Sequence, residues 1–217
     1  MLTMLEEVVL LAVDENTGGL RSTREFGTVY ALVGAVLFDL SLAGKIDTDT
    51  ETVNIIDRTP TGNATLDRVL AEMTRRPDLN TVQDWIEHIY HRKADLEGEA
   101  LASLIQQGIL CHEKSKRMWV VDVERFPVVS NRHQQHVKIR LAEAIRTDGI
   151  PDTRDIMLVS IAEPCGLLGY VLDEAELDRR RERIQTLCNL ETISRKVTRA
   201  IVRLDHTLRQ RMVPRVI

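Results

Sequence analysis

Apolar side chains recur every three or four residues along most of this chain, which is the spacing of one face of an α-helix. In the first such stretch Leu5, Val8 and Val9 share a face, and Thr3 with Glu6 forms the capping box that starts a helix. Similar patterns predict further helices over residues 66–73, 82–89, 96–107, 131–146, 153–162, 167–172, 174–187 and 191–211. We therefore expect a mainly α-helical fold.

One stretch, residues 30–42, is apolar on every side except at Asp39 and ends before Gly44. It is too short to span a bilayer, so it predicts a central helix that other helices surround. No run of 18 uncharged apolar residues occurs, and the first residues lack the basic flank and cleavage site of a signal peptide. We expect a soluble protein that stays in the cytoplasm.

A β-hairpin is predicted after the helix that Gly108 ends, because two apolar segments, residues 109–112 and 118–123, flank the polar residues 113–117. In this interpretation residues 113–117 form the tip. The sequence shows no repeat and no low-complexity linker. We therefore expect residues 1–217 to form a single domain, a helical bundle with one projecting β-hairpin.

Charge is unevenly distributed along the chain. The whole chain has a formal net charge of −4, yet residues 179–217 contain eleven Lys and Arg against three acidic residues. A basic segment of this kind attracts phosphate groups on anionic lipid or nucleic acid if its arginines share a face. The alternative is a solvated helix surface with dispersed charge.

The three cysteines, Cys111, Cys165 and Cys188, show no spacing typical of a metal site or a disulfide framework. This usage fits a reducing cytoplasm, and we expect all three to be small buried hydrophobic residues.

Three segments, residues 2–11, 60–67 and 81–86, stand out for their order and separation. Together they resemble the Golgi phosphoprotein 3 family, and the resemblance continues through the central helix, the hairpin and residues 131–146. It implies a mainly α-helical, non-catalytic peripheral membrane protein that binds phosphatidylinositol 4-phosphate without a cofactor. The short loops and the absence of an arginine-rich N-terminal tail, which eukaryotic members carry, indicate a prokaryotic homologue.

The headgroup pocket that the resemblance implies uses a tryptophan and an arginine near the start of the central helix, and two basic residues on the helix before the hairpin. Arg24, Val33, Ala94 and Glu97 stand at these four positions, and none of them matches. Val33, Ala94 and Glu97 supply none of the charge-assisted donors that a phosphate requires, and Glu97 would repel it. The resemblance therefore predicts the fold but not the specific pocket.

A relocated lipid headgroup site remains open. Arg21 and Arg24 precede the central helix, while Arg92 and Lys93 precede the helix that carries Glu97. If the two segments meet as in the family fold, their side chains would form a shifted anion site. Scattered surface charge is the alternative.

The hairpin is the second candidate site, for membrane contact or self-association. Its residues combine cationic and apolar side chains: Lys114, Lys116, Arg117, Met118, Trp119, Val120 and Val121. A tryptophan suits a membrane interface because its ring is apolar while its N–H stays hydrated. The alternative is that Trp119 packs the hairpin onto the bundle.

No catalytic or metal site is predicted. His112 and Glu113 begin like a zinc-protease motif, but Lys116 stands where the second histidine is required. The histidine pairs at residues 88 and 91 and at residues 133 and 136 have no clustered third ligand. We expect no enzymatic activity, no metal and no cofactor.

Two other interpretations remain. The helix, glycine and hairpin also resemble the latter half of a winged-helix DNA-binding unit, but Asp95, Glu97 and Glu99 would repel the phosphate backbone, so a nucleic-acid partner is not expected. The second interpretation is a cytoplasmic adaptor that binds protein tails without lipid specificity. We expect peripheral attachment to anionic lipid.

Overall fold

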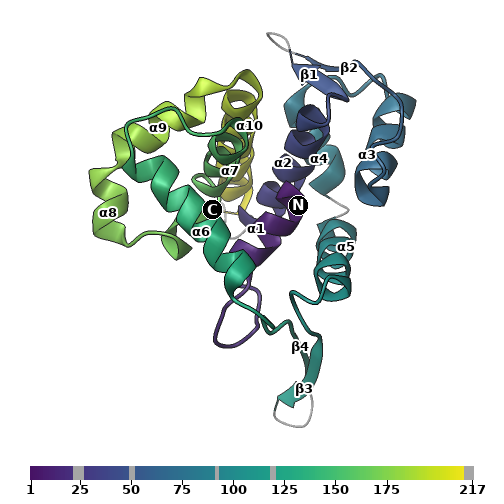
Figure 1. Ribbon diagram of the computed structural model, residues 1–217. Helices are drawn as coiled ribbons and strands as arrows, with labels where there is room; N and C mark the ends of the chain where they lie inside the picture. The colour runs from purple at the N-terminus through teal and green to yellow at the C-terminus, as the bar shows by residue number, and fades with distance from the viewer. Residues whose placement is uncertain (22–26, 49–51, 91–92, 118–120, 213–217) are drawn as a thin grey trace, which may run out of the picture.

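Helix α2 (Gly27–Leu42) lies at the centre of the helices, with α1, α4, α5 and α7 against it (Figure 1). The structure is a computed structural model that describes residues 1–21, 27–48, 52–90, 93–117 and 121–212 of the 217-residue chain. The other helices in this part of the chain are α1 (Met4–Ala12), α3 (Ala64–Arg75), α4 (Val82–Tyr90), α5 (Lys93–Gln106), α6 (Arg132–Arg146), α7 (Thr153–Ala162), η1 (Leu167–Tyr170), α8 (Glu174–Arg179), α9 (Arg181–Leu190) and α10 (Thr192–Met212).

Two small antiparallel sheets complete the described part of the chain. One pairs β1 (Ile46–Thr48) with β2 (Val53–Ile55), and the other pairs β3 (Glu113–Arg117) with β4 (Val121–Arg125). The predicted class, mainly α-helical with a β-hairpin, is confirmed. None of the described helices combines the length and the apolar character needed to cross a bilayer.

The core is a single cluster of buried apolar side chains that reaches from α1 to α10. Helix α2 approaches its neighbours closely at Gly34, where a methyl group would lie 2.7 Å from Ile161 of α7 and 3.0 Å from Val197 of α10. The apolar character of α2 on every side follows from this central position, since each face meets another helix.

Helix α1 depends on a carboxylate from α2. The Oδ1 atom of Asp39 accepts a hydrogen bond from the Met4 amide at 2.9 Å, and Oδ2 accepts one from the Leu5 amide at 3.2 Å. The first N–H groups of a helix have no partner within the helix, and Asp39 satisfies two of them inside the core. Burial raises the pKa of Asp39 to about 6, although the two amides lower it in part.

A second buried carboxylate joins three helices. Glu7 of α1, whose side chain is 3% exposed, lies 2.8 Å from Arg140 of α6 and 3.1 Å from Arg154 of α7. Arg140 also lies 2.6 Å from Asp155. Buried charges are tolerated when they are paired and hydrogen-bonded, and this network meets that requirement.

Polar side chains cap two of the helix starts, and the cap at Thr3 was predicted. Thr3 and Glu6 form the capping box of α1, and Asn63 accepts hydrogen bonds from the amides of Thr65 and Leu66 at the start of α3. The α1 capping box also contacts α5, because Oε1 of Glu6 accepts a hydrogen bond from the Ser103 hydroxyl at 2.6 Å.

Two predictions need correction, and one strand was missed. Residues 174–187 are not one helix, because the chain breaks at Arg180 between α8 and α9, and both halves bond to α6 through Glu176–Arg146 at 2.6 Å and Arg183–Ala144 at 3.2 Å. Strand β1 was not predicted. Cys165 and Cys188 are buried as expected, but Cys111 is only half-buried.

We expect Asp39→Asn to change how stability depends on pH. The folded state binds the Asp39 proton more tightly than the unfolded chain, where the pKa is about 3.8, so this group's contribution falls as pH rises towards 6. The free energy of unfolding of the wild type minus that of the variant should therefore drop by about 2 to 3 kcal/mol between about pH 4 and about pH 7. Urea denaturation at each pH measures this difference.

The exposed Asp148→Asn is the matched control, because it removes a carboxylate that lies outside the core. An Asp39→Asn difference that is independent of pH would contradict the assignment of a raised pKa to Asp39.

Candidate functional site

The β3–β4 hairpin projects away from the helices at the end of the molecule opposite β1 and β2 (Figure 1). Its strands pair in register from Glu113 opposite Arg125 to Arg117 opposite Val121. The predicted tip at residues 113–117 is therefore wrong, because these residues form strand β3. The hairpin itself, as an element, was predicted.

The order of charges along the two strands favours this register. Three of the five cross-strand pairs bring an acidic residue opposite a basic one: Glu113–Arg125, Lys114–Glu124 and Lys116–Asp122. Opposite charges across two antiparallel strands stabilise their pairing, whereas like charges destabilise it. The Nζ atom of Lys114 lies 3.8 Å from a carboxylate oxygen of Glu124, and both side chains are exposed.

The base of the hairpin is tied to the loop that follows α1. The Phe126 amide donates a hydrogen bond to the Gly18 carbonyl at 2.6 Å, and the Cys111 amide donates one to the Pro127 carbonyl at 2.9 Å. The His112 ring stacks on the Phe126 ring with centroids 5.2 Å apart. These contacts fix the direction in which the hairpin leaves the helices.

Asp14 organises that loop. Its carboxylate accepts hydrogen bonds from the Asn16 and Thr17 amides at 2.9 and 2.8 Å, and from Nε of Arg21 at 2.9 Å. The hydrogen bond from Arg21 holds the pKa of Asp14 well below its usual range. The guanidinium of Arg21 also lies 4.5 Å from the centre of the Tyr170 ring.

This arrangement gives Arg21 a role that the sequence did not predict. Arg21 binds Asp14, Asp14 shapes the loop, and Gly18 of that loop holds the hairpin at Phe126. The signal in the sequence was the run from Asp14 to Gly19, which is typical of a turn but does not reveal its partner.

Of the other three predicted headgroup residues, the structure describes only the backbone position of Lys93, so their meeting stays a prediction. Arg24 and Arg92 lie outside the described residues, and Lys93 is the first residue of α5. At the positions of the family pocket, Val33 is fully buried in the core and Glu97 is half-buried. A donor for phosphate is absent at both of these described positions.

The predicted hairpin residues fall into two groups. Lys114, Lys116 and Arg117 belong to β3 and Val121 to β4, and the Lys114 side chain is 73% exposed. Met118, Trp119 and Val120 lie outside the described residues.

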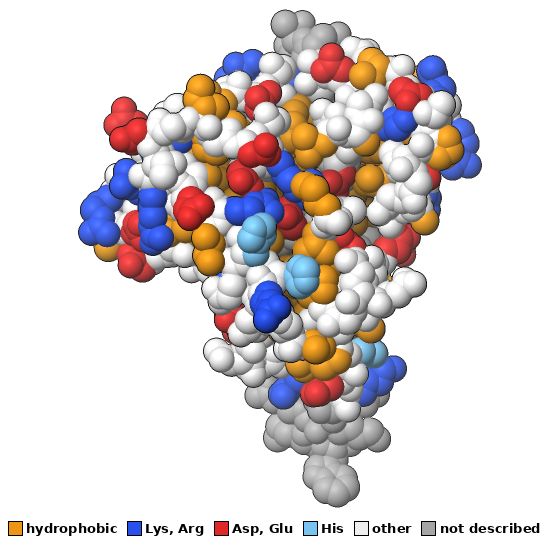
Figure 2. All heavy atoms as spheres, in the orientation of Figure 1, with side chains coloured by type: hydrophobic (Ala, Val, Ile, Leu, Met, Phe, Trp, Pro, Cys, Tyr) orange, Lys and Arg blue, Asp and Glu red, His pale blue; other side chains and the backbone are white. Residues whose placement is uncertain are grey.

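Charges of both signs are interspersed where the hairpin leaves the helices (Figure 2). Among the described residues no group of three His, Cys, Asp or Glu side chains is arranged to hold a metal. His88, one member of a histidine pair noted in the sequence, instead lies 2.8 Å from a carboxylate oxygen of Glu72.

Helices around a buried central helix, with a hairpin that projects from a braced base, define a helical domain of the Golgi phosphoprotein type. The chain belongs to the Golgi phosphoprotein 3 (GPP34) family, whose model matches residues 4–204. The chain is 24% identical to vacuolar protein sorting-associated protein 74 of Eremothecium gossypii, and the match covers 82% of the chain. The match spans 64% of the length of that relative.

We expect Gly18→Ala to loosen the base of the hairpin. Gly18 has a φ of 65°, and a methyl group there would lie 2.6 Å from the backbone nitrogen of Pro127. The left-handed conformation alone should lower the free energy of unfolding by at least about 1 kcal/mol. Hydrogen exchange at the Phe126 amide, together with urea denaturation, measures both effects.

Gly19→Ala is the matched control, because the nearest atom to its methyl group would be the Thr17 hydroxyl at 3.4 Å. This variant should stay within about 0.5 kcal/mol of the wild type. Equal effects of the two substitutions would show that the Gly18 contact does not brace the hairpin.

Proposed function

We propose that the protein attaches from the cytoplasm to anionic membrane surfaces through its β-hairpin, and that it acts without catalysing a reaction. One observation carries this proposal: the hairpin stands clear of the helical core on a braced base (Figure 1). Met118, Trp119 and Val120 stand in the sequence between the last residue of β3 and the first residue of β4.

The composition of the hairpin suits this role. Trp119 has an apolar ring with a polar N–H, which favours the boundary between headgroups and acyl chains. Each nearby lysine or arginine adds about 1 kcal/mol of attraction to an anionic surface. Lys114, Lys116 and Arg117 would therefore support an apolar contact that is too small to hold the protein alone.

The proposal also includes recognition of a particular lipid headgroup. A phosphoinositide would be held by Arg24, which precedes α2 in the sequence, and by Arg92 and Lys93 at the start of α5. Arg21 contributes through the loop that it organises. Val33 is buried at one position of the pocket that the resemblance implies. This supports binding to anionic lipid in general and not binding of one headgroup in that pocket.

A nucleic-acid partner is not favoured. Helix α5, which would be the recognition helix of a winged-helix protein, exposes Asp95 in its first turn. Glu99 of the same helix pairs with Arg68 at 3.1 Å. These carboxylates would repel a phosphate backbone.

We expect Trp119→Ala combined with Lys116→Glu to weaken binding to vesicles without unfolding the protein. The substitutions remove the interfacial ring and reverse one charge, so binding to phosphatidylcholine–phosphatidylserine vesicles should weaken at least about tenfold. Flotation against a vesicle concentration series measures the affinity, and circular dichroism checks the fold.

Ile150→Ala combined with Arg179→Glu is the control, since it removes an exposed apolar side chain and reverses one exposed charge outside the hairpin. This variant should float like the wild type. Unchanged flotation of the hairpin variant would remove the hairpin from the proposed function, and a change in oligomeric size alone would assign it to self-association.

A further inference from the structure

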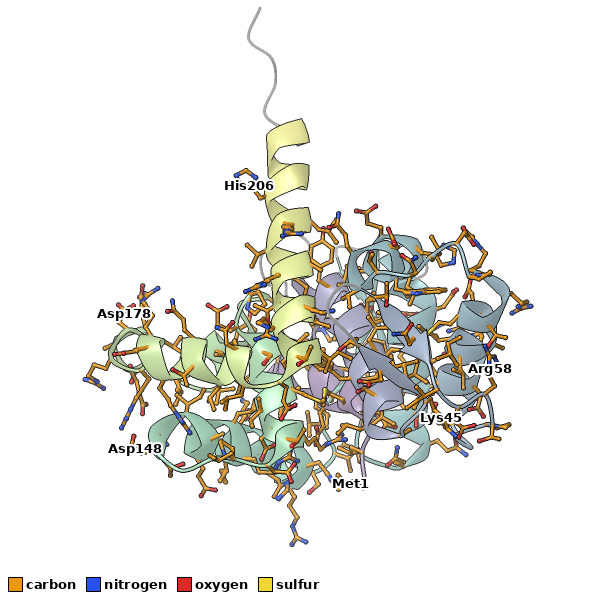
Figure 3. The ribbon with its side chains drawn as sticks, turned by 90° about the horizontal axis from the view of Figure 1, so that it is seen from above. Met1, Lys45, Arg58, Asp148, Asp178 and His206 are labelled. Carbon is orange, nitrogen blue, oxygen red and sulfur yellow. The ribbon has the colours of Figure 1, made fainter. Side chains whose placement is uncertain are left out.

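A groove of about 710 Å³ lies between α10, the start of α4 and the end of β1. Figure 3 shows α10 crossing this side of the molecule and extending past the other helices, with His206 towards its projecting end. Its lining includes four basic residues of α10, namely Arg195, Lys196, Arg199 and Arg203, and among the described residues that line it none is acidic. Strand β1, whose last residue lines the groove, lies at the end of the molecule opposite the hairpin (Figure 1).

Helical spacing explains how these cations converge. Arg195, Arg199 and Arg203 are four residues apart, so they form one row along the face of α10 that borders the groove. Like charges at this spacing repel each other and destabilise a helix. An anion in the groove would remove that repulsion.

Two arginines of this row have side chains that no neighbouring residue neutralises in the part of the chain that the structure describes. Within the described part of the chain, the side chains of Arg195 and Arg199 have no salt bridge and no hydrogen bond, whereas Arg140 and Arg154 are paired with buried carboxylates. The nearby carboxylate of Asp84 is bound to the amide and hydroxyl of Thr81 in a helix cap.

The groove also offers neutral donors. Two helices begin at it, α4 at Val82 and α10 at Thr192, and the first N–H groups of a helix carry partial positive charge. The side chains of Thr48 and Thr192 line the same space. Hydroxyl groups next to arginines complete the set of donors that phosphate oxygens accept.

We propose that this groove binds a ligand that carries a phosphate monoester, either a soluble phosphorylated molecule or a lipid headgroup. The planar guanidinium groups of Arg195 and Arg199 each present two parallel N–H donors, which match two oxygens of one phosphate. The volume lies within the roughly 300–1,000 Å³ of small-molecule sites, so the groove has room for more than the phosphate itself.

Calorimetric titration of the full chain with inorganic phosphate and with glycerol 3-phosphate, in a chloride buffer of constant ionic strength, tests this site. The wild type should show saturable binding. Arg195→Gln combined with Arg199→Gln should weaken it at least about tenfold, because two charge-assisted contacts are lost. Arg179→Gln with Arg181→Gln removes the same charge from exposed arginines outside the groove and should bind like the wild type.

Flotation with phosphatidylcholine vesicles, with and without phosphatidic acid, distinguishes the two sources of phosphate. Binding that requires phosphatidic acid and is lost in the Arg195→Gln/Arg199→Gln variant would support the site and assign it to a lipid headgroup. Binding of soluble phosphate alone would support it and assign it to a soluble ligand. Equal binding by all variants, or no binding of any of these probes, would overturn the proposal.

The hairpin variant Trp119→Ala/Lys116→Glu separates this site from the proposed membrane contact. It leaves the groove intact, so it should bind soluble phosphate like the wild type even if its flotation with phosphatidylserine vesicles is lost.

Discussion

The buried carboxylate of Asp39 is the constraint on which the packing of the first helix depends. Residues 4–12 of α1 are all buried, so water does not satisfy the amides at its start, and Asp39 accepts hydrogen bonds from two of them. Helix α1 in turn contacts α2, α5, α6 and α7. Glu7 also connects α1 to Arg140 and Arg154, so polar contacts at two buried carboxylates hold α1 in place.

Patterns among neighbouring residues predicted much of this fold. They did not predict contacts between residues that lie far apart in the sequence. The capping box at Thr3 needs only a residue three positions away, and it was predicted. Asp39 is 35 residues from Met4, and the sequence showed it only as an interruption of an apolar stretch. Such a pairing depends on how helices pack, which periodicity does not describe.

For the candidate site, too, the sequence predicted local features but not contacts between distant residues. Apolar patterning predicted a hairpin near residues 109–123, but it placed the tip too early because it assigned the charged residues 113–117, which form β3, to the turn. Arg21 was predicted as a headgroup residue from its charge alone, and its partners Asp14 and Tyr170 emerge only from the fold. The uneven charge of the C-terminal segment was evident in the sequence, but not the groove that three of its arginines border.

The charged strands of the hairpin have a consequence for solubility. A two-stranded arm that stands alone exposes unpaired N–H and C=O groups along both outer edges, where further strands could add and start an aggregate. Four of the five residues of β3 and three of the five residues of β4 are charged. Charged side chains along an exposed edge discourage the addition of further strands, so the arm can stay exposed without seeding fibril growth.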